Sequence, residues 1–187
     1  MKYLARAILS NALLVFLTMG INDMAYSNDS ISLPDEQRCA WSEDRGFKVV
    51  VQRPEKIAPD IFPIATLFRY NEGKKEIVWT LDLPIYVGPR YFLVSDSGVV
   101  LFVDEWIRKR QTDYALILID QSGKIEATSL DTLFEMANTA RDEALNSSRF
   151  GGWLSIEPKF ISTNKALLGI GGKNLIIDLD RDISSDQ

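Results

Sequence analysis

The sequence predicts a mainly β fold of antiparallel, propeller-like hairpin repeats, arranged as a partial propeller or a sandwich, with one packed amphipathic helix. The first observation is an internal repeat: residues 93–98 and 118–123 match at an offset of 25 positions, and each ends in a short turn of Asp, Ser and Gly. Repeated hairpins at regular spacing are typical of modular all-β folds. The second observation is a single stretch, residues 130–145, whose apolar residues recur with the period of a helix.

The N-terminus has the order of a secretory signal peptide. Lys2 and Arg6 form a basic start, and residues 7–21 are largely apolar. Ala25 and Ser27 then place small side chains at the −3 and −1 positions of a cleavage site. The alternative is a membrane anchor that is never cut, but the strongest apolar run is shorter than the roughly 20 residues that a spanning helix needs.

We therefore expect cleavage after Ser27, which makes residues 1–27 a signal peptide and residues 28–187 a single β-rich domain. The product would be exported, to the periplasm or out of the cell. No later segment is apolar enough to predict a membrane span after the signal is removed.

The first part of the mature chain predicts little regular structure. Residues 28–45 are polar and are expected to be irregular, whereas residues 46–52, with Phe47 and three successive valines, predict a first strand. Three prolines follow between residues 54 and 63, and they disfavour a central strand there because proline cannot donate to a ladder.

Four pairs of strands are expected next, each joined by a turn that contains glycine, for which a positive φ costs little. The pairs are 64–70 with 75–81, 91–95 with 99–103, 114–119 with 124–128, and 166–170 with 174–179. The two middle pairs make four strands in under 40 residues, the size of one propeller blade. The mature chain is too short to close a ring of such blades, which favours a partial propeller or a sandwich.

The helix is expected between Leu130 and Leu145 as a single amphipathic element. Its apolar positions are Leu130, Leu133, Phe134, Ala137, Ala140 and Ala144. Their period is close to 3.6, so one face would pack on a sheet. Thr128 or Ser129 could cap its first turn.

A resemblance covers about a quarter of the chain. Its marks are the segments 92–98, 102–106, 117–120 and 123–125, followed by the helical segment 129–134. Together, residues 91–134 resemble a propeller-like β-repeat found in exported bacterial proteins of uncharacterised function. The resemblance implies an exported β-repeat domain, and it implies no catalytic residue.

The amino-acid composition excludes several classes of function. The chain has no histidine and one cysteine, so imidazole-assisted Ser or Cys nucleophiles and most catalytic zinc sites are excluded. We expect no cofactor and no tightly bound transition metal, and we assign no metal ligand; calcium binding by carboxylates alone stays open, since oxygen ligands need no imidazole. The signal holds two basic residues and one acidic residue, which leaves the mature chain with a net charge near −6. That charge disfavours nucleic acid as a partner.

Aromatic residues and one acidic pair are the best candidates for a site. Trp79, Trp106 and Trp153, together with Tyr86, Tyr91 and Phe92, could form a binding platform for sugars or peptides, or they could fill the core. Asp104 and Glu105, beside Trp106, could serve glycoside hydrolysis as paired carboxylates, or they could form ion pairs in an exposed loop. The candidate ligand-binding residues are therefore Trp106, Asp104, Trp79 and Trp153, and no catalytic residue is assigned.

Two further patterns favour ordinary structure. Cys39 is expected to be a small buried residue near Trp41, with a reactive thiol as the alternative. The aspartates 178, 180 and 182 alternate as in the first half of a calcium loop, but the chain lacks the glycine and glutamate that such a loop requires. A solvated acidic terminus is the simpler explanation.

The sequence thus favours an exported, non-catalytic binding or structural module whose partner is a protein or a carbohydrate, bound at an exposed strand edge or on an aromatic face. The alternative is a carboxylate-dependent hydrolase acting on carbohydrate through Asp104 and Glu105. A pocket in which two carboxylates converge would favour the hydrolase, and an exposed aromatic face without one would favour the binding module.

Overall fold

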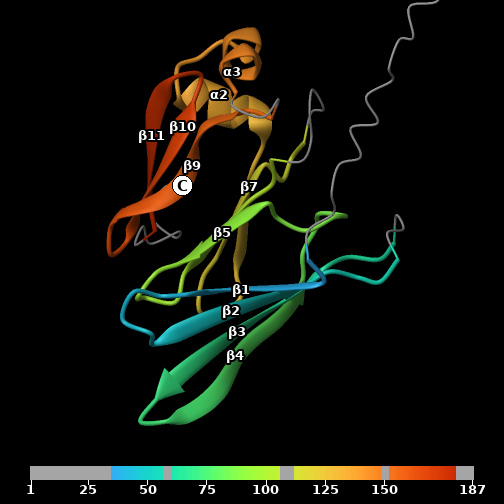
Figure 1. Cartoon of the computed structure of the whole chain (residues 1–187), viewed down its shortest axis with the longest axis vertical. Coiled ribbons are helices and arrows are strands. Elements are labelled where there is room, and N and C mark those ends of the chain that lie inside the picture. The colour runs from blue at the N-terminus through green and yellow to red at the C-terminus, as the bar shows by residue number, and fades with distance from the viewer. Residues whose placement is uncertain (1–34, 57–59, 106–111, 149–151, 180–187) are drawn as a thin grey trace, which may run out of the picture. The chain divides into compact units, whose positions relative to one another are not determined.

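Three antiparallel sheets and two short helices make up the part of the chain that the computed structural model describes (Figure 1). This part comprises residues 35–56, 60–105, 112–148 and 152–179, all within one compact unit, Leu33–Gln187. The expectation of a mainly β, antiparallel fold is therefore confirmed. The expected signal peptide lies outside the described residues. Neither described helix is long and apolar enough to cross a membrane.

The first sheet has the order β1-β2-β3-β4. Its strands are β1 (Gln37–Trp41), β2 (Phe47–Gln52), β3 (Ile64–Asn71) and β4 (Lys74–Asp82). Strand β1 corrects the expectation that residues 28–45 are irregular, because residues 37–41 pair in full register with residues 48–52. Its sequence gave no alternation of apolar and polar residues, so its pairing with β2 decides its conformation.

The second sheet has the order β5-β6-β7-β8 and is the four-stranded unit expected between residues 91 and 128. Its strands are β5 (Tyr91–Val94), β6 (Val100–Val103), β7 (Leu116–Ile119) and β8 (Ile125–Thr128). The two repeated turns are equivalent. The N–H of Gly98 donates to the Ser95 carbonyl at 3.0 Å, and the N–H of Gly123 donates to the Asp120 carbonyl at 3.1 Å.

This second sheet is buried on both faces. Along β6, Val100 and Phe102 belong to the hydrophobic cluster formed with β1–β4, and Leu101 and Val103 belong to the cluster formed with the helices and β9–β11. Successive side chains of a strand point to opposite faces, so one continuous apolar strand supplies both clusters.

The third sheet has the order β11-β10-β9. Its strands are β9 (Leu154–Ser162), β10 (Lys165–Ile170) and β11 (Lys173–Asp178). The turn between β10 and β11 consists of Gly171 and Gly172, with φ of 59° and 73°. Two consecutive positive φ values are the requirement of a tight two-residue hairpin, which explains this glycine pair.

The structure replaces the single expected helix with two, α2 (Leu130–Met136) and α3 (Arg141–Ser147). Ser129 caps α2 as expected: its hydroxyl accepts from the N–H of Thr132 at 3.1 Å. The break has a local cause at Asn138, which has a φ of 48°. The N–H of Asn138 donates to Glu135 and that of Thr139 to Phe134, at 2.9 and 3.0 Å, which is the pattern of a Schellman helix end.

Candidate functional site

Asp104 and Glu105 follow directly after β6 and are both buried, with only 5% and 2% of their surface exposed. The expected alternative of an exposed loop of ion pairs is therefore wrong. The physical reason is that partners from distant segments cover the two residues. Asp104 donates its backbone N–H to the carbonyl of Ala115 at 2.9 Å, which extends the pairing of β6 with β7 by one residue.

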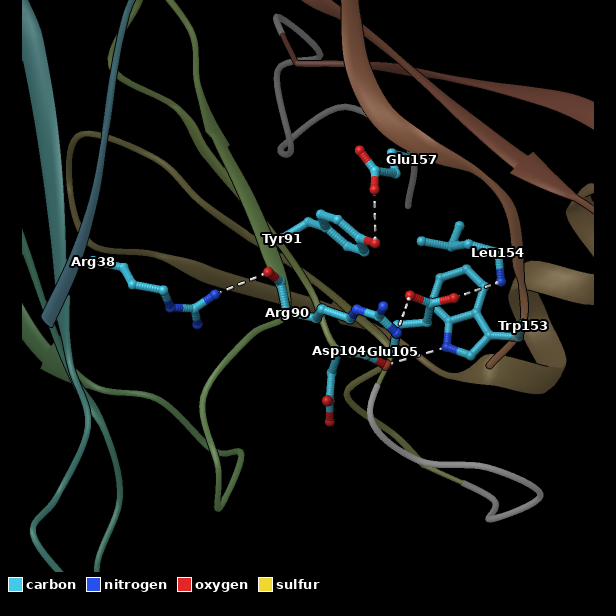
Figure 2. A network of polar contacts seen from close by, with 8 residues as sticks. All are labelled: Arg38, Arg90, Tyr91, Asp104, Glu105, Trp153, Leu154 and Glu157. Carbon is cyan, nitrogen blue, oxygen red and sulfur yellow. Dashed lines mark hydrogen bonds and ion pairs between the residues drawn. The ribbon is translucent and has the colours of Figure 1, made fainter. Parts of the chain in front are cut away.

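The carboxylate of Glu105 is held from two sides (Figure 2). Arg90 Nη1 lies 3.0 Å from Oε2, and the backbone N–H of Leu154 donates to Oε1 at 3.2 Å. Gly152 leaves room for this carboxylate, since a Cβ at that position would lie 2.5 Å from Oε1. Oε1 thus accepts a hydrogen bond, whereas Oε2 is held by the ion pair and has no hydrogen-bond partner within the described part of the chain, and a glycine is required beside the carboxylate.

Trp153 also belongs to this region, where it contacts the backbone of the acidic pair. Its side chain is fully buried, and its indole Nε1–H donates to the backbone carbonyl of Asp104 at 3.1 Å. The carboxylate of Asp104 points away from that of Glu105 in Figure 2. The two acids therefore do not converge on one point, as the paired carboxylates of a glycosidase would have to.

The network extends toward both neighbouring sheets. Tyr91 donates its hydroxyl to Glu157 on β9 at 3.4 Å. From β1, Arg38 donates to the carbonyl of Arg90 at 2.9 Å and also to that of Pro89. Residues from all three sheets meet around the start of β5, so the network ties the sheets together.

Burial sets the electrostatics of this network. The pKa of Glu105 is raised, first by loss of solvent; Arg90 and the N–H of Leu154 oppose that shift, and Glu157 adds to it. Burial likewise raises the pKa of Tyr91, and the negative charge of Glu105 adds to the effect. For Arg38 burial lowers the pKa, and Asp35 opposes the change. These shifts have structural causes and do not by themselves identify a reaction.

The structure does not bring the candidate tryptophans together. Trp79 on β4 is 7% exposed and donates its Nε1–H to the carbonyl of Asp120 at 2.9 Å. It belongs to the cluster formed with β1–β4, whereas Trp153 belongs to the cluster formed with the helices. Both residues therefore fill cores, which was the alternative to an aromatic platform. Trp106 lies outside the described residues.

Half-buried aromatic residues gather instead on the outer face of the first sheet, whereas the exposed Tyr86 and Tyr114 lie outside that sheet. One row of side chains crosses all four strands, with Trp41 opposite Lys48, Lys48 opposite Phe68 and Phe68 opposite Ile77. Tyr70 lies beside this row, with its ring centroid 4.9 Å from that of Trp41. We call Trp41, Lys48, Phe68, Tyr70, Lys75 and Ile77 the aromatic face.

Cations lie over the rings of the aromatic face. Lys48 Nζ is 4.9 Å and the Arg45 guanidinium carbon 5.5 Å from the Trp41 ring centroid. Lys75 Nζ is 3.8 Å from the centroid of Phe68. These distances are those of cation–π contacts. Sequence reasoning missed the face, although the alternation of Lys48, Val50 and Gln52 with buried valines in β2 was a usable signal.

The two remaining candidates lie elsewhere. Cys39 on β1 is a free and exposed thiol, so the expectation that it is buried is wrong: its side chain is on the outer face of an edge strand. Asp178 forms a 3.9 Å ion pair with Lys165, and the aspartates at 180 and 182 lie outside the described residues.

No group of three metal-ligating side chains occurs in the part of the chain that the structure describes. Comparison of the chain with protein-family models, with curated proteins and with solved structures gave no match.

Proposed function

We propose that this protein is an exported, non-catalytic binding module whose ligand lies on the aromatic face. The observation that carries the proposal is the row from Trp41 through Lys48 and Phe68 to Ile77 on the outer side of the first sheet, in which Ile77 is exposed and the other three side chains are partly exposed. A partner would gain from covering it, because tryptophan and tyrosine are enriched among the residues that supply most of the energy at binding surfaces.

Exposure of apolar groups on this side of the sheet supports the proposal. Ile77 is 66% exposed, and Ile64, on the same outer face, is 43% exposed. The rings of Trp41, Phe68 and Tyr70 are half-buried by one another and by the cations above them. Large apolar groups gathered on one exposed face are a common mark of an interaction site.

The acidic pair supports a binding role over hydrolysis. Glu105 has both oxygens engaged, with Arg90 and with Leu154, and the Asp104 carboxylate points away from it. A general acid must be able to reach the substrate, and a carboxylate buried to this degree cannot do so without rearrangement. The hydrolase is therefore not retained as a second candidate.

The proposal also states which fold class the protein has and that the protein is exported. The second sheet would be one propeller-like blade of the exported β-repeat class that residues 91–134 resemble, with the first and third sheets packed against it. Export would follow from the signal peptide expected at residues 1–27. A binding module of this kind acts through its surface and does not require catalytic residues.

The experiment is a binding screen of the exported protein against immobilised neutral polysaccharides, acidic polysaccharides and peptides. The double variant Trp41→Ala, Phe68→Ala should lose at least ten-fold in affinity for the ligand found, while it keeps the circular dichroism spectrum and the cooperative unfolding of the wild type. The control is Tyr114→Ala, which removes a 39% exposed aromatic residue outside the aromatic face. Equal binding by the double variant and the wild type would exclude this face, and turnover of a glycoside that is lost in Glu105→Gln would favour the hydrolase.

A further inference from the structure

The aromatic face concentrates positive charge on an acidic protein. The whole chain has a formal net charge of −5. Nevertheless Arg45, Lys48 and Lys75, from a turn, from β2 and from β4, all lie over rings of this face. Charge complementarity therefore predicts an anionic ligand there.

The acids near these cations remain charged but lie off the outer face of the strands: Glu43 and Asp44 are in the turn between β1 and β2, Glu72 is in the turn between β3 and β4, and Glu76 is opposite Arg69, on the other side of β4 from Lys75. The carboxylate of Asp44 is engaged within its own turn, where it accepts from the Ser42 hydroxyl at 2.6 Å and from the N–H of Gly46 at 2.7 Å. Glu43 is exposed in the same turn. Asp82 lies at the far end of β4, seven residues from Lys75, which is about 23 Å along a strand.

The spacing of the cations favours a ligand with several anionic groups. Lys48 and Lys75 lie on β2 and β4, which are separated by β3. Strands are about 4.8 Å apart, and Lys75 is two residues from Ile77, which is in the row of Lys48, so the two lysines originate about 12 Å from each other. Their ammonium groups lie over different rings, those of Trp41 and Phe68, and an extended chain with repeated charges can contact both.

Hydroxyl groups beside the aromatic row favour a sugar. Thr66 and Thr80 are directly opposite each other in the next row, with their Oγ1 atoms 3.2 Å apart. The face thus places hydroxyl groups, aromatic rings and ammonium groups within two neighbouring rows. A sugar ring with a carboxylate has a complementary set: hydroxyl edges, C–H groups that suit the negative face of an aromatic ring, and an anion for lysine.

We propose that the aromatic face binds a carboxylated polysaccharide along the row from Trp41 to Ile77. This inference rests on the proposed function and specifies its ligand class. Lys48 and Lys75 pair with carboxylates, Trp41 and Tyr70 contact the apolar faces of the sugars, and the Thr66–Thr80 pair contacts hydroxyl groups. Single-stranded nucleic acid could use the same stacking and charges, but its denser phosphates would be repelled more strongly by the acidic remainder of the chain.

The test uses polygalacturonate as the carboxylated probe, the same polymer fully methyl-esterified as its uncharged counterpart, and dextran as a neutral glycan. Isothermal calorimetry of the exported protein should detect binding of polygalacturonate only, with affinity falling at least ten-fold between 50 and 500 mM NaCl because paired charges are screened. The double variant Lys48→Gln, Lys75→Gln should lose at least ten-fold in affinity. The matched control is Lys159→Gln, which removes an exposed lysine of β9.

Three outcomes would overturn the inference. If dextran or the esterified polymer binds as well as polygalacturonate, and Trp41→Ala abolishes that binding, the proposed binding module stands and the anionic ligand is wrong. If only single-stranded DNA or vesicles with anionic headgroups bind through Lys48 and Lys75, the face is anion-binding but its ligand is not a glycan. If no probe, peptides included, binds in a way that depends on the face, the proposed function fails as well.

Discussion

Glu105, just after β6, and Arg90, just before β5, form a 3.0 Å ion pair in which the Glu105 side chain is almost completely buried. The second carboxylate oxygen accepts from Leu154 at the start of β9, so this one side chain bridges the second and third sheets. A buried ion pair of this kind contributes less to the free energy of unfolding than the attraction between its charges suggests, because both charges lose solvent. Removing one partner is nevertheless costly, because the charge of the other is left buried.

The first prediction concerns pH. Because burial raises the pKa of Glu105, the folded protein holds that proton more tightly than the unfolded chain does. The stability that Glu105 contributes is therefore fully present below the ordinary glutamate pKa of 4.5 and is lost as pH rises through the raised folded-state value. Urea unfolding from pH 4 to 8 should show the wild type losing stability relative to Glu105→Gln as pH increases.

The control for this measurement is Glu135→Gln, which removes an exposed carboxylate of α2. Its stability difference from the wild type should change little over the same range. A Glu105→Gln difference that is flat with pH, or that changes in the opposite direction, would show that the ion pair with Arg90 outweighs burial.

The second prediction uses three glycines with similar backbones and different surroundings. Gly73, Gly98 and Gly123 have φ of 77°, 76° and 83°. An added Cβ at Gly73 meets nothing within 4 Å, at Gly123 it meets ordinary contacts from 3.7 Å, and at Gly98 it lies 2.8 Å from Phe47 Cε1. Alanine at Gly73 or Gly123 should cost about 1–2 kcal/mol of unfolding free energy for the left-handed backbone alone.

Alanine at Gly98 should cost about 1–3 kcal/mol more than alanine at Gly73, because it also displaces the buried ring of Phe47. Chemical denaturation of the three variants measures the difference directly. Equal costs at all three positions would mean that Phe47 moves aside freely.

The third prediction separates core tryptophans from surface ones. Trp153→Ala should cost about 3–5 kcal/mol because the side chain is fully buried. Trp41→Ala should cost about 1 kcal/mol, since it loses a half-exposed ring and its cation–π contacts with Arg45 and Lys48. Melting curves that rank the two variants in the opposite order would contradict this division.

The fourth prediction tests the break between α2 and α3. Asn138 adopts a φ of 48°, and its carbonyl accepts from Lys173 Nζ at the start of β11. Asn138→Gly should retain or slightly increase stability, because glycine is the preferred residue at this position of a Schellman end. Asn138→Ala should lose about 1–2 kcal/mol, because alanine resists a left-handed backbone. Identical unfolding midpoints for the two variants would exclude a backbone effect.

The fifth prediction is the mature N-terminus. If residues 1–27 are a signal peptide, the exported protein begins at Asn28. Intact-mass measurement of the protein recovered from the cell exterior or periplasm checks this directly. A protein that retains Met1 after export would contradict both the cleavage site and the signal itself.

The hairpins are the part of the fold that the sequence determined most fully. Each is a local structure in which apolar strands flank a turn, and the turn demands glycine at a positive φ, as at Gly98 and Gly123. Such constraints act between neighbouring residues, so they are visible without knowledge of the rest of the chain. The helix cap at Ser129 is local in the same sense. The break at Asn138 was not predicted, because asparagine is only a weak signal for a left-handed residue.

The site was decided by tertiary structure. Whether Asp104 and Glu105 are exposed depends on Arg90, Gly152 and Leu154, and the Glu105–Leu154 contact spans 49 residues of sequence. Alternation along β2 and β3 places Lys48 and Phe68 on one face, but only the packing of the second sheet against the opposite face leaves this one open. Burial is a property of which elements pack together, and that depends on contacts between distant residues that no local pattern encodes.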